Sequence, residues 1–258
     1  MIKRIITGII LFPALVILIL KAPWWLVFSA LILTAGVCIF EWLNLFDFPK
    51  ILIFYGEFLL LNALYWGFFL NLPSFFLIFL FLAGSFLPFL FNYQKEIFGE
   101  AFFPFFTGLC YVFLGCLSFW KIFNCSRILL LFFFCVVFAS DTGAYFTGKF
   151  LGRRPFFPEI SPKKTLEGFL GGIIFAILIS ILLSKYFNLF TTYQAINIGI
   201  MLAIVESIGD LFESAFKRFV GKKDSGKIIW GHGGMLDRID GALFAGPVFL
   251  LALRIFVK

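Results

Sequence analysis

Charged side chains are sparse in this chain, but many of them gather between Ser214 and Asp240. Carboxylates bind Mg²⁺ in proteins, and Lys and Arg side chains bind phosphate oxygens. Glycine-rich backbone, as at Gly233 and Gly234, can point several N–H groups at a phosphate. The composition of this stretch therefore predicts a site that binds phosphate groups together with a metal ion.

Acidic residues are spaced so that two helices could present them to each other. Glu206, Asp210 and Glu213 lie at i, i+4 and i+7, which places them on one helical face, and Asp237 and Asp240 would share a face of a second helix. A charged residue at bilayer depth costs about 2.5–3.5 kcal/mol on insertion scales, so a buried cluster is expected to be functional. The competing interpretation is a helix end that already lies at the membrane interface, where acids cost little. We predict that Asp210 and Asp237 hold a divalent metal ion.

Two further carboxylates extend the predicted metal site. Asp240 and Asp141, the latter within Ser-Asp-Thr-Gly-Ala-Tyr, are expected as neighbouring ligands or as partners of the ligands. The predicted cofactor is Mg²⁺, which is usually bound by one or two carboxylates, waters and substrate phosphates. The number of metal ions and a second, monovalent cation stay open. For Asp141 the competing interpretation is a carboxylate paired with Lys or Arg.

The other polar residues of the site are assigned by their chemistry. His232 is the one histidine, which argues against a histidine-rich metal site and a Ser-His-Asp triad. Residues expected to act near the reacting phosphates, with the role of Asp224 left open, are Lys217, Arg218, Lys223, Asp224, His232 and Arg238. Residues expected to bind substrate are Lys163, Lys164, Ser214, Lys227, Gly233 and Gly234.

The composition fixes the surroundings of this site. Hydrophobic residues make up 62% of the chain and charged residues 14%, whereas soluble domains have about 45–50% and about 25%. Stretches of about 20 apolar residues, enough to cross a bilayer as a helix, recur throughout. The predicted fold class is therefore all-α, a polytopic integral membrane protein with about nine transmembrane helices. Its expected spans cover residues 5–20, 24–40, 51–70, 74–91, 102–120, 127–147, 166–184, 194–213 and 239–257.

The charges also suggest an organisation and an orientation. Residues 1–126 are predicted to form a transmembrane scaffold and residues 127–258 the transmembrane catalytic region of one integrated membrane domain. Short loops rich in Lys and Arg favour the cytosol. With the N-terminus inside, nine alternating crossings place both basic loops, 148–165 and 214–238, on the cytosolic side, so an odd number of spans is favoured. We expect the N-terminus and the active site to be cytoplasmic. A retained first span without organelle-type targeting favours a bacterial inner membrane.

The net charge of +7 is concentrated in those two loops. Nucleic acid is not an expected partner, because its binding needs an extended basic face with residues that read the bases. Anionic lipid and nucleotide are expected instead, although basic residues beside a membrane can also serve only to set topology. The spacing of Gly168 and Gly172 allows helices to approach closely within or between chains, so a homodimer stays open.

The spacing of the charged residues matches a known signature. The run Ser214-x-x-Lys217-Arg218-x4-Lys223-Asp224 is followed by His232-Gly233-Gly234-x-x-Asp237-Arg238-x-Asp240. Together these motifs closely resemble the signature of the phosphatidate cytidylyltransferase (CDP-diacylglycerol synthase) family. Three upstream runs also resemble that family: Ser140-Asp141-Thr142-Gly143-Ala144-Tyr145, Gly148-Lys149-x-x-Gly152-Arg153 and Ser161-Pro162-Lys163-Lys164-Thr165-x-Glu167-Gly168.

The resemblance implies that the phosphate of phosphatidate attacks the α-phosphorus of CTP, with magnesium required, to give CDP-diacylglycerol and pyrophosphate. A phosphate monoester has its second pKa near 6 and is largely dianionic at pH 7, so this nucleophile needs no strong base. The site would have to align the substrates and neutralise their charge, which metal ions, Lys and Arg can do. The expected partners are CTP, phosphatidate and membrane lipid.

Three alternatives remain on sequence grounds. Asp237-Arg-Ile-Asp240-Gly241 matches the opening of the CDP-alcohol phosphotransferase motif, but no further Asp follows Asp240. A lipid-alcohol kinase that uses CTP is chemically closer. A transporter could use intramembrane acids as ion ligands, although the two halves of the chain do not resemble each other.

Overall fold

The computed structural model of the chain describes residues 2–69, 74–91, 95–226, 228 and 233–256. Across these residues the fold consists of helices and their connections, and Pro155 and Thr165 form an isolated β-bridge. The helices are α1 (Ile2–Lys21), α2 (Trp24–Leu45), α3 (Lys50–Phe69), α4 (Ser74–Phe91), α5 (Lys95–Cys125), α6 (Arg127–Leu151), α7 (Leu166–Phe187), α8 (Thr192–Phe219) and α9 (Leu236–Phe256).

The predicted fold class is confirmed, and every predicted span overlaps one of these helices. Within the described ranges, six helices are long and apolar enough to cross a membrane: α2, α3, residues Phe98–Cys125 of α5, α6, α7 and α8. The chain is therefore an all-helical, polytopic membrane protein.

Several helices of the C-terminal half begin at residues that cap them. The side chain of Ser126 accepts a hydrogen bond from the first turn of α6, and that of Thr165 does the same for α7. Thr191 and Gln194 form a reciprocal capping box at the start of α8. Asn188 ends α7 in the left-handed conformation that this residue tolerates well. Local sequence thus fixes where these helices start and stop.

Helix α8 extends beyond its predicted apolar span, which ended at residue 213. The added turns carry Lys217 and Arg218, basic residues that suit the negative end of the helix dipole. The span prediction followed hydropathy, whereas the helix continues through its polar end. As a result, Asp210 and Lys217 belong to one continuous helix.

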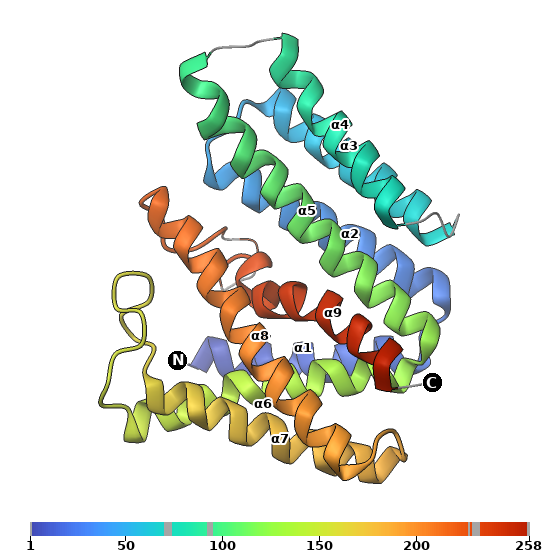
Figure 1. The fold of residues 1–258 in the computed structure, drawn as a ribbon, viewed down its shortest axis with the longest axis vertical. Helices are drawn as coiled ribbons and strands as arrows, with labels where there is room; N and C mark the ends of the chain where they lie inside the picture. The colour runs from blue at the N-terminus through green and yellow to red at the C-terminus, as the bar shows by residue number, and fades with distance from the viewer. Residues whose placement is uncertain (1, 70–73, 92–94, 227, 229–232, 257–258) are drawn as a thin grey trace.

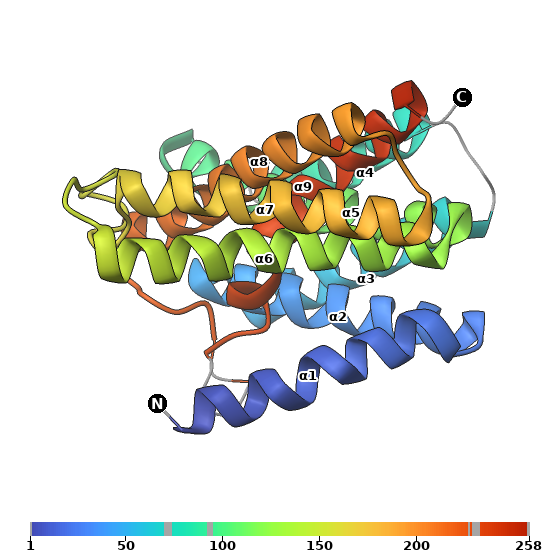
Figure 2. The ribbon, with the colours of Figure 1, turned by 90° about the horizontal axis from the view of Figure 1, so that it is seen from below.

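The helices run roughly side by side (Figure 2). The α6–α7 connection, the α8–α9 connection and the start of α1 lie at the same end of the bundle. Helix α7 packs between α6 and α8, and α8 packs against α9 (Figure 1). The two basic connections therefore share one end of the molecule.

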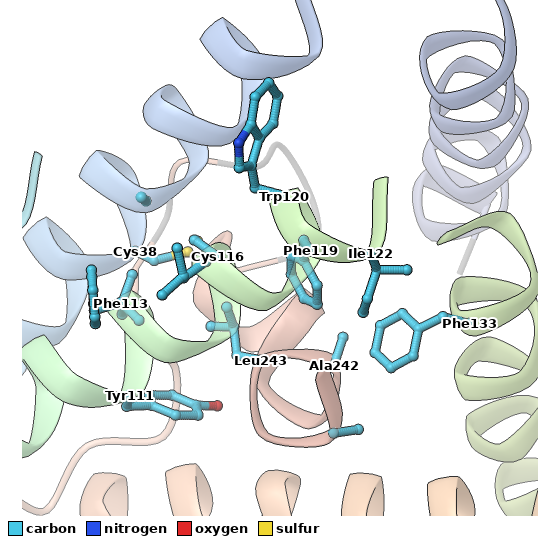
Figure 3. Close-up of a cluster of buried hydrophobic side chains, with 14 of the residues drawn as sticks. Cys38, Tyr111, Phe113, Cys116, Phe119, Trp120, Ile122, Phe133, Ala242 and Leu243 are labelled. Atoms are coloured by element: carbon cyan, nitrogen blue, oxygen red, sulfur yellow. The ribbon is translucent and has the colours of Figure 1, made fainter. Parts of the chain in front are cut away.

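Helix α5 joins the two halves of the chain through the core. Its Phe119 and Ile122 lie between Leu243 of α9 and Phe133 of α6 (Figure 3), and all four side chains are buried. The rings of Phe119 and Phe133 are 5.6 Å apart between centroids. Packing of aromatic rings against aliphatic side chains holds α9, which carries the predicted site residues Asp237, Arg238 and Asp240, against the N-terminal half.

Gly168 and Gly172 mediate a close approach of α7 to α6 within the chain. A Cβ atom at Gly168 would lie 2.9 Å from the backbone oxygen of Ala144, and one at Gly172 would lie 3.0 Å from that of Ser140. The spacing of these glycines is thus used inside one chain. The homodimer stays a prediction.

We expect Gly168→Ala to lower the thermal denaturation midpoint of the detergent-solubilised protein, because the added methyl group meets backbone that cannot rotate away. Overpacking of this kind costs about 1–3 kcal/mol. Gly36→Ala in α2 is the matched control, since no atom lies within 4 Å of its added Cβ. Equal midpoints for the two variants would contradict the close α6–α7 contact.

Candidate active site

Carboxylates from three helices gather toward the end of the bundle that carries the basic connections. The carboxyl groups of Asp141 and Glu206 lie in hydrogen-bonding contact, and so do those of Glu213 and Asp240. Asp210 interacts electrostatically with both pairs. The structure thus brings the predicted helical face of α8 against α6 and α9.

Two glycines let α8 and α9 approach closely enough for this arrangement. A Cβ atom at Gly209 would lie 3.1 Å from the Cα atom of Gly241. In turn, a Cβ atom at Gly241 would lie 2.8 Å from Cγ of Glu206. Larger residues at this crossing would separate the acids of α8 from those of α9.

Basic side chains compensate part of the negative charge. Lys164, from the α6–α7 connection, forms an ion pair of 2.6 Å with Asp210, which also accepts a 3.2 Å hydrogen bond from Ser214. Lys217 forms ion pairs with Glu213 and, at 2.7 Å, with Asp237. A predicted phosphate-binding lysine is therefore engaged by two carboxylates in this structure.

Asp237 organises the connection between α8 and α9. Besides Lys217, its carboxylate accepts hydrogen bonds from the backbone N–H groups of Ser225 at 3.1 Å and Gly234 at 2.9 Å. Gly233 has a φ of 81°, and a Cβ atom there would lie 2.9 Å from Oδ2 of Asp237. Both glycines therefore pack against the carboxylate of Asp237. That Gly233 and Gly234 bind phosphate stays a prediction.

A pocket of about 590 Å³ opens beside the carboxylates, between α6, α8 and the α6–α7 connection. A larger cavity of about 1010 Å³ is lined mainly by aromatic and aliphatic side chains, such as Phe46 and Tyr55, away from the carboxylate cluster. We assign the site to the smaller pocket because it combines cations with carboxylates. The charged side chains that line it are Asp141, Lys149, Lys163, Lys164, Glu206 and Asp210.

The α6–α7 connection is held in shape by its own polar groups. The carboxylate of Glu167 accepts hydrogen bonds from the backbone N–H groups of Arg153 at 3.0 Å and Arg154 at 3.1 Å. Arg218 of α8 donates a 3.1 Å hydrogen bond to the backbone oxygen of Ile160. Arg218, which the sequence assigned to phosphate, therefore ties the two basic connections together here.

The remaining predicted residues are less closely joined to the cluster. Arg238 interacts electrostatically with Asp141, while Lys223 and Asp224 are exposed in the α8–α9 connection. Lys227 and His232 lie outside the described residues.

The structure also points to acids that the sequence prediction did not assign to the site. Glu206 and Glu213 were recognised as part of the α8 face but not as site residues, yet both are buried within the cluster. Glu41 of α2 is buried against the α8–α9 connection. An acid within an apolar span indicates a functional site. Glu41, however, directly follows the predicted span 24–40, where an acid is common at the membrane surface.

The donor set fits a divalent cation that is completed by substrate. Within the described ranges, no three or more His, Cys, Asp or Glu side chains form a ready metal cage. Mg²⁺, however, is usually held by one or two carboxylates together with substrate phosphates. Oε1 of Glu213 is buried and receives no hydrogen bond from a donor, while its carboxyl faces Asp240. Facing carboxylates need a shared proton or a cation between them.

Comparison of the sequence with known proteins shows the family to which the chain belongs. A model of the cytidylyltransferase family matches residues 2–256, nearly the whole chain. The chain belongs to this family. It is 39% identical over 147 residues to phosphatidate cytidylyltransferase of Staphylococcus epidermidis RP62A, covering 57% of this chain and 56% of that protein.

Two further relatives of this cytidylyltransferase family member match over a similar length. The chain is 48% identical over 127 residues to phosphatidate cytidylyltransferase of Bacillus subtilis 168, covering 48% of this chain and 47% of that protein. It is 41% identical over 129 residues to the uncharacterized protein YnbB of Escherichia coli K12, covering 50% and 43%. The matched stretch spans about half the length of these curated relatives.

We expect Lys217→Met to lower the thermal denaturation midpoint strongly, because it leaves the carboxylates of Glu213 and Asp237 buried without their cation. Breaking a buried ion pair costs about 3–5 kcal/mol. The double variant Lys217→Met/Glu213→Gln should recover part of the loss. The exposed Lys185 at the far end of α7 supplies the control Lys185→Met. If Lys217→Met melted like this control, the proposed charge balance would be wrong.

Proposed function

We propose that the protein transfers the cytidylyl group of CTP to phosphatidate and releases pyrophosphate. The observation that carries this proposal is the pocket beside the carboxylates, in which Lys163 and Lys164 stand next to Asp141 and Asp210. Cations and carboxylates in one pocket suit polyphosphate and metal ion together. Membership of the cytidylyltransferase family supports the nucleotide, and the membrane helices support a lipid acceptor.

The reaction depends more on alignment of the lipid phosphate with the α-phosphorus of CTP than on a strong base. An oxygen of the lipid phosphate forms a bond to the α-phosphorus of CTP. The bond from that phosphorus to the bridging oxygen breaks, and pyrophosphate leaves with the electron pair. Because the attacking phosphate is already largely dianionic at pH 7, proton removal is not the main obstacle. Lys163 and Lys164 would neutralise the phosphate charges that crowd together.

We propose Mg²⁺ as the cofactor, held by Asp210 together with Asp141 or Asp240. Asp237 stays a predicted ligand, but its carboxylate already accepts hydrogen bonds from Lys217, Ser225 and Gly234. When bound, the metal would neutralise phosphate charge and align the two substrates. The carboxylates would hold that cation, while Ser214 orients Asp210 through its hydrogen bond.

We further propose that the site opens to the cytoplasm of a bacterium, with the N-terminus on the same side of the inner membrane. The two basic connections support this orientation because both lie at one end of the bundle. Membrane lipid is then both the surroundings and the source of one substrate.

The proposed transfer can be tested by following which product receives the α- and the γ-phosphorus of CTP. Purified protein with phosphatidate and Mg²⁺ should move label from [α-³²P]CTP into a chloroform-soluble product, while label from [γ-³²P]CTP should stay in the aqueous pyrophosphate. Omitting Mg²⁺ or phosphatidate should abolish the lipid label. Transfer of the γ label to lipid would identify a kinase. If neither labelled form of CTP gave labelled lipid, the proposed transfer from CTP to phosphatidate would be contradicted.

Asp210→Asn tests the metal proposal, since it keeps the shape of the side chain and removes its charge. We expect the Mg²⁺ concentration for half-maximal activity to rise at least about tenfold. The thermal denaturation midpoint should change little, because Asp210 is partly exposed at the pocket. Glu100→Gln, a change to an exposed acid on α5, is the matched control. An unchanged Mg²⁺ requirement in Asp210→Asn would remove Asp210 from the metal site.

A further inference from the structure

Glu41 is a buried carboxylate from the N-terminal half that contacts the catalytic half directly. It is only 2% exposed. Its Oε1 accepts a 3.1 Å hydrogen bond from the backbone N–H of Met235, and its Oε2 accepts one of 2.9 Å from that of Leu236. The hydroxyl of Ser225 donates a third hydrogen bond, of 3.3 Å, to Oε2. Both oxygens of this carboxylate are therefore occupied by the α8–α9 connection.

These contacts supply a cap that α9 does not have in its own sequence. The first N–H groups of any helix lack partners within the helix, and a Ser, Thr, Asp or Asn usually satisfies one of them. Gly234 and Met235, which precede α9, have no such side chain. The carboxylate of Glu41 takes this place from α2, and its negative charge also suits the positive end of the helix dipole.

The space around this carboxylate fits it closely. A Cβ atom at Gly234 would lie 2.6 Å from Oε2 of Glu41, and one at Gly226 would lie 2.8 Å from Cδ of Glu41. The backbone on both sides of the α8–α9 connection thus packs directly on the carboxyl group. This contact explains the absence of a side chain at Gly234, a glycine of the site motif.

A second contact joins the same two elements. The ammonium group of Lys222 donates hydrogen bonds to the backbone oxygens of Asn44 at 3.1 Å and Leu45 at 2.7 Å, which end α2. It also pairs with Asp47 at 2.8 Å. The end of α2 therefore holds the α8–α9 connection near its beginning through Lys222 and near its end through Glu41.

We propose that Glu41 is a positioning residue for the transfer reaction. By fixing the start of α9, it sets where Asp237 and Asp240 stand relative to α8. Glu41 does not touch the pocket, so it acts through the backbone that it holds and not on the substrate. This inference rests on the proposed function for its activity readout, but its structural readout is independent of that function.

The test compares Glu41→Gln and Glu41→Asp with wild type in detergent micelles that contain phosphatidate. Gln offers one acceptor oxygen and sets an NH₂ group against a backbone N–H, so part of the cap is lost. We expect kcat to fall about ten- to hundredfold, as misplacement by about 1 Å can do, with a smaller change in KM for CTP. Glu41→Asp keeps the charge and should retain more activity than Glu41→Gln.

Hydrogen exchange followed by mass spectrometry gives the readout that needs no activity. In Glu41→Gln the peptide containing Met235 and Leu236 should exchange faster than in wild type, while peptides from α7 should not change. Glu57→Gln on α3 makes the same Glu-to-Gln change away from the α8–α9 connection and is the matched control. Ser180→Ala, which removes a buried hydrogen bond to Ala195, is the control for a loss of stability alone.

The outcomes separate this inference from the proposed function. If Glu41→Gln exchanges like wild type, or if it lowers only stability, as Ser180→Ala should, Glu41 is not a positioning residue. If Glu41→Gln does not fold, the same two comparisons are made on Glu41→Asp. If wild type makes no labelled lipid, the proposed function fails, and the exchange result alone then decides whether Glu41 holds the connection.

Discussion

The structure depends on balancing several carboxylates that face one another inside a membrane protein. Two pairs, Asp141 with Glu206 and Glu213 with Asp240, lie in contact. Such pairs repel unless a proton, a cation or hydrogen-bond donors compensate them, and the effect is strong where water is scarce. Lys164 and Lys217 supply part of the compensation. A divalent cation shared with substrate phosphates would supply the rest, which links the stability of this end of the bundle to its proposed chemistry.

Small residues and donors from distant parts of the chain make this crowding feasible. Glycines at the α8–α9 crossing let the acids of the two helices meet, and glycines of α7 let it approach α6. The N-terminal half takes part as well, because Glu41 caps α9 and Lys222 binds the end of α2. The first half of the chain therefore contacts the α8–α9 connection directly at both of its ends.

The sequence predicted what depends on local spacing and hydropathy. The helices of the described ranges followed from apolar stretches, and the face shared by Glu206, Asp210 and Glu213 followed from helical periodicity. It could not predict the pair of Lys164 with Asp210 or the cap by Glu41, because both depend on how segments far apart in the chain fold together. It also assigned Lys217 to phosphate. Glu213 lies one helical turn before Lys217 on α8, but Asp237, the second carboxylate partner, becomes a neighbour only when α8 meets α9.

The central claim is that acids of α6, α8 and α9 together hold a divalent cation. Its most direct measurement is anomalous X-ray diffraction from crystals grown with Mn²⁺ in place of Mg²⁺ and with CTP present. We expect an anomalous peak within ligand distance of carboxylate oxygens of Asp210 and of at least one of Asp141 and Asp240. A peak only elsewhere, or none while CTP is bound, would contradict it.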